Sequence, residues 1–335
     1  MYKSRMLDVR KVIILSVWFV FAILWLTGCS PQPDIKMILK TIPNDHRENI
    51  ENLFLQLCIN SSAAYTLFGP KPMSNEGYTD DVWVMTPLEL HFPSETLVFK
   101  HGWDSWTRYR DLFPSQKFSL KRIPFRDHPS YWHIFLVNKS ATLTVLKRHI
   151  ETFNEVLDSD YSAEDLWAKM DGSDSFFQSI VEHTELLGIL LGYGRANAEA
   201  FTRRAEICFY LSRYSTPPFQ LNHEWEKLTP ESQRFVHLYT ANISPVSLIP
   251  KTLEPSAGYH SLADELNAIC SRTCFFELEG CHHFLEYYGR PVFMTLENEP
   301  EAAEWKQLYI HTQKHLNRVL KGKPFIETVL TQWMR

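Results

Sequence analysis

The stretch "YWHIFLVNKSATLTVLKRHIETFNEVL" (residues 131–157) indicates the fold class, because the spacing of its apolar residues changes in the middle. Residues 131–137 form a continuous aromatic and β-branched run, which is typical of a strand. After Asn138 the apolar residues recur every three or four positions, along one face of a helix: Leu143, Leu146, Ile150, Phe153 and Leu157. The chain is therefore expected to contain both strands and helices, and it changes from one to the other near residue 138.

Short apolar runs upstream of this point predict strands. The runs, counting the one just described, are residues 81–85, 95–100, 117–123 and 131–137. Helices are expected over 45–60 and 101–113, and the glycines and prolines of residues 67–77 predict a loop. The fold class that follows is α+β, with a small, mainly antiparallel sheet in the N-terminal half packed with a mostly helical C-terminal half.

The C-terminal half predicts helices and one long connection. Ser162 and Asp165 have the spacing of a helix-capping pair. Residues 185–211 are apolar nearly all round at their start and are expected to form one central, buried helix. Later elements are helices over 261–271 and 300–322, a strand over 290–296 and a short helix after Pro324. Segment 214–259 holds six prolines and is expected to be a packed loop, a lid or a binding surface.

Composition indicates a folded body and excludes one class of partner. The chain has 335 residues, of which 44% are hydrophobic and 22% charged, and these values are close to those of globular proteins. The net charge is −5, and the first 28 residues carry +3, so subtracting leaves −8 on the remainder. A body with that charge has no bulk attraction to phosphate backbones, so nucleic acid is not expected as a partner.

A second informative stretch is "FAILWLTGCSPQPD" (residues 21–34), read with the residues before it. Four basic residues precede the run Val12–Leu26, whose only polar member is Ser16. The run has 15 residues, whereas a helix that crosses the hydrocarbon layer needs about 20. A positive flank followed by a short apolar run predicts an export signal.

The residues Leu26-Thr27-Gly28-Cys29 resemble the lipobox of bacterial lipoproteins: an aliphatic residue, two small residues and a cysteine. The resemblance covers only this N-terminal segment. It implies cleavage between Gly28 and Cys29, a diacylglyceryl group on the Cys29 thiol and acylation of the new N-terminus, as by palmitate. Two or more acyl chains anchor a protein stably. The alternative is an uncleaved membrane anchor with an incidental cysteine.

The lipoprotein resemblance also implies a location and a set of boundaries. In that family an Asp after the cysteine retains the protein at the inner membrane, so Ser30 favours the outer membrane of the bacterial cell envelope. The chain then divides into a signal peptide (1–28), Cys29 with a tether (29–44), a helix-plus-sheet region (45–138) and a helical region (139–335). Prolines in the tether discourage helix there. The sequence allows the regions 45–138 and 139–335 to form one domain together.

The densest group of potential ligands is "CSRTCFFELEGCHH" (residues 270–283). It holds Cys270, Cys274, Cys281, His282 and His283. Cysteine and histidine are the usual zinc ligands, but the paired CxxC spacing of zinc ribbons is missing. Exported proteins often form disulfides, here from Cys281 to Cys270 or Cys274. With Cys29 acylated, these three cysteines with Cys58 and Cys208 make an odd number. Three alternatives stay open for these residues: a disulfide, buried free thiols, or a metal site. The compartment favours the disulfide.

Four other patterns have simpler structural explanations. His311 and His315 share a helix face but lack the glutamate of HExxH, so they are expected to be surface histidines. "GYGRAN" (192–197) lacks the third glycine of a phosphate-binding loop and follows no strand. "DSDYSAED" (158–165) lacks the glycine and glutamate of a calcium loop and suits a helix cap. A packed core explains the tryptophans better than a ligand platform does: Trp83, Trp103, Trp106 and Trp132.

The sequence predicts a membrane-anchored envelope lipoprotein with a binding or structural role, because the anchor signal is strong and no GxSxG, SxxK or Walker pattern is present. The alternatives are a lipid-anchored hydrolase that acts on envelope material and a zinc-binding module built on residues 270–283. A cleft lined by segment 214–259 and holding a dyad of perturbed pKa would favour the hydrolase. Catalytic and metal-binding residues stay unassigned, no cofactor is expected, and the expected partners are the membrane, through Cys29, and a protein.

Overall fold

The chain divides into two units in the computed structural model, Met1–Pro43 and Asn44–Arg335. The structure describes residues 34–79, 93–125, 128–214, 224, 226–233, 236, 253–276 and 293–335. The expected signal peptide with Gly28 and Cys29, and the expected strand at 81–85, lie outside the described residues, as does most of segment 214–259.

A short helix, α2 (Ile35–Thr41), forms the described part of the first unit. It lies where the prolines predicted no helix, so that prediction was wrong. The prolines flank this helix instead of interrupting it. Asp34, which follows Pro33, is the N-cap, and its carboxylate accepts a hydrogen bond from the N–H of Lys36 at 2.9 Å. A cap of this kind satisfies an N–H group that the first turn leaves without a partner.

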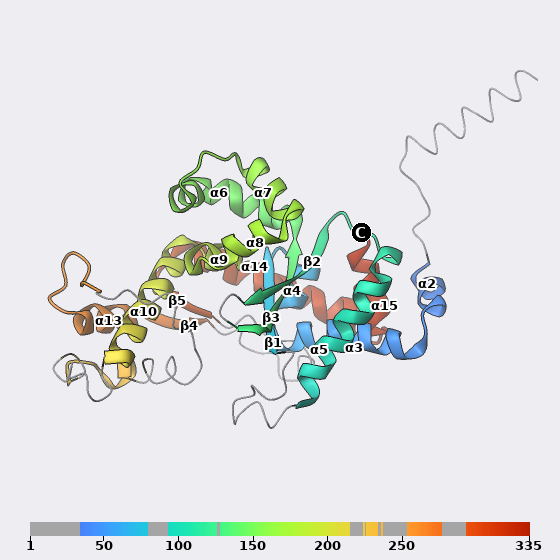
Figure 1. Cartoon of the computed structure of the whole chain (residues 1–335), viewed down its shortest axis with the longest axis horizontal. Coiled ribbons are helices and arrows are strands. Elements are labelled where there is room, and N and C mark those ends of the chain that lie inside the picture. Colours follow the sequence, from blue (N-terminus) through green and yellow to red (C-terminus); the bar gives the residue numbers. More distant parts are fainter. Residues whose placement is uncertain are drawn as a thin grey trace, which may run out of the picture. The chain divides into compact units, whose positions relative to one another are not determined.

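The main sheet of the second unit has three antiparallel strands in the order β1-β3-β2 (Figure 1). The strands are β1 (Met73–Thr79), β2 (Phe118–Phe125) and β3 (His128–Asn138). The expected strands at 117–123 and 131–137 are confirmed. The α+β fold class with a small antiparallel sheet in the N-terminal half is confirmed as well.

The edge strand β1 was not expected, because its residues were assigned to a loop. Its central glycine explains how the strand fits: a Cβ added at Gly77 would collide with the side chain of Tyr131 on β3. Glycine in a strand often marks such a close approach. Pairing with β3, and not the β propensity of its own residues, therefore explains why β1 forms a strand.

Residues 95–100 were expected to be a strand and belong instead to helix α5 (Pro93–Tyr109). Phe99 and Trp106 are both buried and lie seven residues apart, which is two helical turns. The buried ring of Phe99 stacks on Tyr78 of β1 at 5.6 Å. Packing of this helical stripe outweighs the local preference of "ETLVFK" for a strand.

An aromatic core forms where α5 meets two other helices and β2. The other helices are α3 (Asn44–Asn60) and α15 (Phe325–Trp333), and the short α4 (Ala63–Phe68) packs beside them. The ring centroid of Trp333 lies 5.1 Å from that of Trp106 and 5.9 Å from those of Phe54 and Phe118. The indole N–H of Trp333 donates to the carbonyl of Phe113 at 2.9 Å. The last helix therefore completes a core that the first hundred residues begin.

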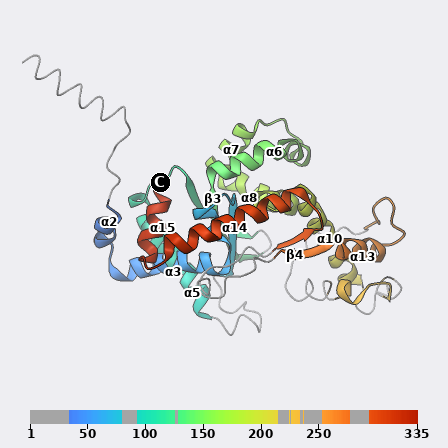
Figure 2. The ribbon, with the colours of Figure 1, turned by 180° about the vertical axis from the view of Figure 1, so that it is seen from behind.

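The remaining elements are mostly helices. They are α6 (Lys139–Leu157), α7 (Ala163–Gly172), α8 (Asp174–Val181), α9 (Thr184–Leu190), α10 (Arg195–Tyr214), α13 (Leu262–Ser271) and α14 (Pro300–Leu320), with the antiparallel pair β4 (Thr273–Phe276) and β5 (Phe293–Leu296). Figure 2 shows α14 running from near α15 towards β4. The expected capping pair is confirmed, because the Ser162 hydroxyl accepts from the N–H of Asp165 at 3.1 Å.

Candidate functional site

The turn between α9 and α10 joins two clusters of polar side chains. It comprises residues 191–194, in which Gly192 and Gly194 have φ values of +84° and +80°. Glycine adopts this left-handed conformation without the steric cost that a Cβ brings. The single helix expected over 185–211 was therefore wrong, and "GYGRAN" begins as a turn between two helices.

Lys71 contacts the beginning of this turn and is only 1% exposed. Its ammonium group donates to the carbonyl oxygen of Leu191, the C-cap of α9. The same nitrogen lies 5.5 Å from the ring centroid of Tyr193 and 5.9 Å from that of Tyr309. The negative end of a helix and the faces of two rings both attract a cation. No carboxylate among the described residues pairs with this lysine.

Burial lowers the pKa of Lys71 to about 7 and raises the pKa of Tyr193 to about 12. The amine is therefore partly neutral near pH 7, and a neutral amine is a base and a nucleophile. A substrate does not reach it, because protein atoms cover the side chain almost completely. We interpret Lys71 as an internal support of the turn.

His149 and Glu301 form a hydrogen-bonded pair at the other end of the turn. The Nε2 atom of His149 lies 3.0 Å from Oε1 of Glu301. His149 interrupts α6 with a non-helical φ of −121° and ψ of 18°. A Cβ added at Gly194 would lie 2.6 Å from Oε2 of Glu301, so the glycine leaves room for this carboxylate. Arg148 bonds Glu301 at 3.3 Å and Glu304 at 3.1 and 3.2 Å.

This pair has the arrangement of a proton-transfer dyad. The hydrogen bond from His149 is the largest effect that lowers the pKa of Glu301, while burial opposes it and Arg148 adds to it. An ionised carboxylate only accepts, so Nε2 of His149 carries the proton of this hydrogen bond. No described residue bonds Nδ1. A carboxylate-oriented imidazole suits general acid–base chemistry, and the same contacts also hold α6 against α14.

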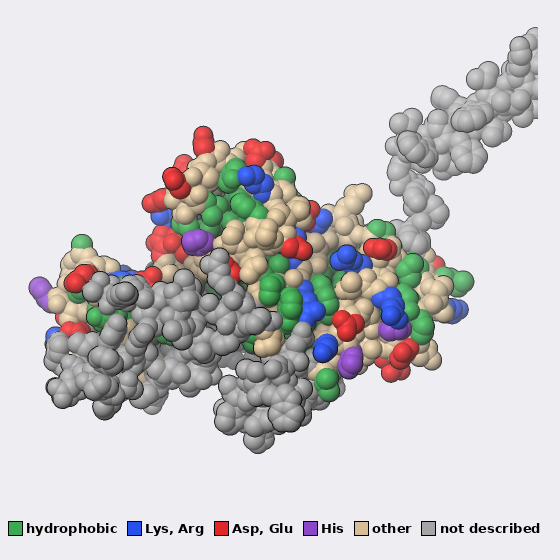
Figure 3. Space-filling model, in the orientation of Figure 1, with side chains coloured by type: hydrophobic (Ala, Val, Ile, Leu, Met, Phe, Trp, Pro, Cys, Tyr) green, Lys and Arg blue, Asp and Glu red, His purple; other side chains and the backbone are tan. Residues whose placement is uncertain are grey.

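The surface around α6 and α7 is rich in acidic side chains, as Figure 3 shows. The first turn of α7 contributes Glu164 and Asp165, and Glu164 is paired with Lys147 at 2.7 Å. Carboxylates gathered on one surface repel anions and attract cations. However, the basic side chains of Lys147 and Arg148 lie beside these carboxylates, so the surface next to His149 carries charges of both signs.

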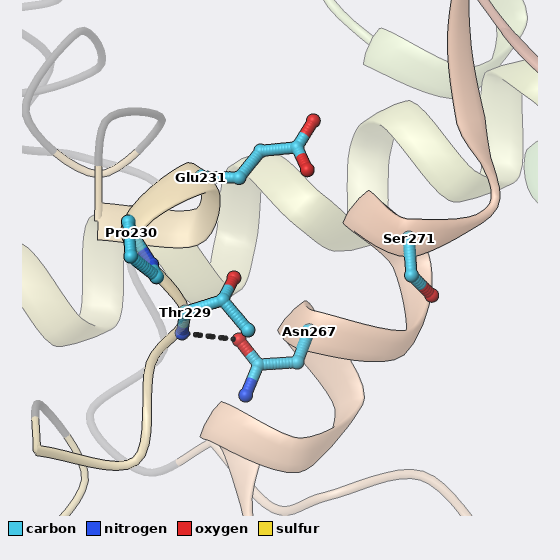
Figure 4. A pocket seen from close by; sticks show the side chains of 5 residues that line it. All are labelled: Thr229, Pro230, Glu231, Asn267 and Ser271. Carbon is cyan, nitrogen blue, oxygen red and sulfur yellow. Dashed lines mark hydrogen bonds between the residues drawn. The ribbon is translucent and has the colours of Figure 1, made fainter.

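A pocket of about 480 Å³ lies between residues 229–231 and α13. Figure 4 shows that the backbone N–H of Thr229 donates to Oδ1 of Asn267, at 3.0 Å. The amide of Asn267 also donates to a backbone carbonyl at 2.8 Å, and Ser271 donates within its own helix at 3.1 Å. Glu231 points away from Thr229 and Asn267. The described lining residues therefore offer a ligand mainly one carboxylate and hold no acid–base dyad.

The structure places only part of the 270–283 cluster. Cys270 is buried and unpaired, as are Cys58 and Cys208. Cys274 lies in β4, while the residues outside the described part are Cys281, His282 and His283. Within the described part of the chain, no three or more His, Cys, Asp and Glu side chains are arranged to hold a metal ion. The zinc site and the Cys281 disulfide stay predictions.

The other candidate residues occupy ordinary positions. His311 is exposed on α14, and His315 is half-buried one turn later. Burial lowers the pKa of His315, and the charges of Arg318 and His311 add to the effect. Of the tryptophans, Trp106 belongs to the aromatic core, Trp103 and Trp132 are partly buried, and Trp83 lies outside the described residues.

Sequence reasoning missed Lys71, His149 and Glu301. A weak signal existed for His149, because it stands on the apolar face of a predicted helix, three residues after Leu146 and four before Phe153. Lys71 lies in a segment assigned to a loop. Glu301 lies in the first turn of its helix, where acidic residues are common in any helix, so its position gave no signal. The pairing of His149 with Glu301 spans 152 residues and leaves no local pattern.

Comparisons of the chain with family models, with curated proteins and with solved structures found no match. Among the helices that the structure describes, none combines the length and the apolar content needed to cross a membrane.

Proposed function

We propose that the chain is an acyl-anchored lipoprotein of the bacterial cell envelope with a binding or structural role. The observation that carries the proposal is the order of features at the N-terminus: a basic flank, an almost wholly apolar run of 15 residues, two small residues and Cys29. An apolar run of this length suits an export signal better than a membrane span. The acyl chains on Cys29 then hold the Asn44–Arg335 unit at the membrane.

A binding role agrees better than catalysis with the pocket between residues 229–231 and α13. Segment 214–259 supplies part of its wall, as expected of a binding surface. The described lining holds one carboxylate, that of Glu231, and no histidine, lysine or cysteine. A site of this composition can orient a polar ligand but has no described pair of groups to move a proton.

Metabolic labelling with an alkyne-bearing palmitate analogue tests the anchor. We expect labelled, shortened protein from the parent and an unlabelled, full-length precursor from Cys29→Ser. Full labelling and processing of Cys29→Ser would rule out acylation at this residue. Ser30→Asp is the matched variant for location. It should be acylated as the parent is, yet move from the outer to the inner membrane fraction on a density gradient.

The His149–Glu301 pair favours a second candidate function, an anchored hydrolase that acts on envelope material. A carboxylate-oriented imidazole with an uncommitted Nδ1 is suited to activate water. The test is turnover of peptidoglycan and of phospholipid by the purified full chain in mild detergent. Activity should disappear in His149→Gln and persist in His311→Gln, which changes an exposed histidine of α14. No turnover by the parent protein would eliminate this candidate.

A further inference from the structure

Helix α2 has one buried side and one exposed side, and the exposed side carries no acidic residue. Ile35 and Leu39 are buried. Successive residues of an α-helix are turned by about 100° from one another, so Lys36, Met37 and Lys40 lie together on the opposite side. All three side chains are exposed, and the exposed fraction of Met37 is 58%. We call these three residues the basic face of α2.

The charge of α2 is opposite to that of the rest of the chain. Residues 35–41 contain two lysines and no Asp or Glu, so they carry +2. The chain after residue 28 carries −8, and subtracting α2 leaves −10 on the other residues. An anionic bilayer surface repels that charge and attracts the basic face. Lysines beside an exposed apolar side chain are typical of helices that lie on such a surface.

The position of α2 in the sequence brings this face to the membrane in the proposed lipoprotein. Ile35 follows Cys29 by six residues. Six residues span at most about 22 Å when fully extended, so acyl chains on Cys29 keep the beginning of α2 within that distance of their bilayer. A tether this short makes docking of α2 an intramolecular event, for which a weak contact is sufficient.

We propose that the basic face of α2 binds the anionic phospholipid surface of the membrane that holds the acyl chains. The inference rests on the proposed function, because Cys29 supplies the tether. Lys36 and Lys40 contact the lipid phosphates, and the side chain of Met37 enters the boundary between headgroups and acyl chains. Each lysine near such a surface should raise the ratio of docked to undocked helix about fivefold.

Photo-cross-linking from position 37 tests the proposal. The full chain with benzoylphenylalanine in place of Met37 is purified from its membrane and reconstituted into vesicles of phosphatidylcholine, with or without phosphatidylglycerol. Mass spectrometry of the irradiated protein then detects lipid adducts on α2. We expect adducts that require phosphatidylglycerol and that decrease at high salt, which screens exposed charges. Position 37 is suitable because its side chain is mostly exposed, so the larger residue does not disturb the core.

Two matched controls separate the basic face from general attraction to the vesicle. Lys36→Gln combined with Lys40→Gln should lower the ratio of docked to undocked helix about 25-fold. Lys314→Gln combined with Lys323→Gln removes the same charge from two exposed positions outside α2 and should not lower it. Benzoylphenylalanine in place of Phe201, which is 40% exposed on α10, should give few lipid adducts.

The proposal is overturned if positions 37 and 201 give equal lipid adducts, or if adducts at 37 need neither phosphatidylglycerol nor the two lysines. A protein adduct in place of a lipid adduct, after irradiation of intact cells, would also overturn it. The mass of the N-terminal peptide from the same sample tests the anchor separately. Acylated Cys29 without adducts at 37 leaves the proposed function intact, whereas phosphatidylglycerol-dependent adducts on unacylated protein remove the anchor and leave the basic face.

Discussion

Replacing Lys71 with methionine is expected to remove a pH dependence from the stability of the protein. Burial lowers the pKa of this lysine to about 7 in the folded state, from an ordinary value of 10.5. Between these values the unfolded chain binds one proton more than the folded chain does, so the free energy of unfolding rises with pH. Below pH 7 both states are protonated, and burying the charge costs about 5 kcal/mol.

The size of the effect follows from the same two pKa values. Between pH 6.5 and pH 8.5 the linkage adds about 2 kcal/mol to the free energy of unfolding of the parent protein. Lys71→Met removes that gain. It also leaves the carbonyl of Leu191 without its donor, which costs about 1–3 kcal/mol at either pH. The variant should therefore be more stable than the parent at pH 6.5 and lose about 2 kcal/mol of that advantage by pH 8.5.

Urea unfolding of the full chain in mild detergent, followed by tryptophan fluorescence at both pH values, measures this difference. Contributions of other titrating groups, such as His133 with its pKa lowered to about 4, cancel in the comparison. Lys314→Met is the matched control, because Lys314 is an exposed lysine of α14. It should follow the pH profile of the parent. Parallel profiles for Lys71→Met and the parent would show that Lys71 does not titrate with a lowered pKa in the folded protein.

Two further predictions concern the turn between α9 and α10 and the residues packed against it. Gly194→Ala should lower the free energy of unfolding by about 1–3 kcal/mol, because φ is +80° and the new Cβ meets Glu301. Gly172→Ala is the control and should not lower it, because a Cβ at Gly172 has open space around it. Urea unfolding compares the two variants. Glu301→Gln should lower the free energy of unfolding by about 1–3 kcal/mol at pH 7. This loss should shrink as the pH falls through the lowered pKa of Glu301. Urea unfolding of the parent and the variant at pH 7 and at acidic pH measures the loss and its pH dependence.

The elements that could be predicted from the sequence are those whose burial pattern is local. Residues 131–157 changed from a strand run to a helical stripe, and β3 and α6 formed there. The prediction of a strand at 95–100 failed because six residues are too few to distinguish a strand from a buried helical turn. The turn at Gly192 and Gly194 was missed because the apolar residues before it continue the helical pattern.

The polar contacts could not be predicted, because each joins positions far apart in the sequence. Lys71 reaches Leu191 across 120 residues, and His149 reaches Glu301 across 152. A lysine in a loop and a histidine in a helix are both common, so neither Lys71 nor His149 is conspicuous in the sequence. Only the folded backbone shows that a two-glycine turn brings both pairs to its two ends.

The aromatic core has a consequence for when the protein can fold. Trp333 bonds the carbonyl of Phe113 across 220 residues, and Gln332 bonds that of Leu67 across 265. Contacts of such long range form late and slowly. The core around Phe54 and Trp106 therefore stays open until α15 has been synthesised. If the proposed export signal acts, a chain whose core waits for α15 can still pass, as an extended thread, through a channel too narrow for a folded domain.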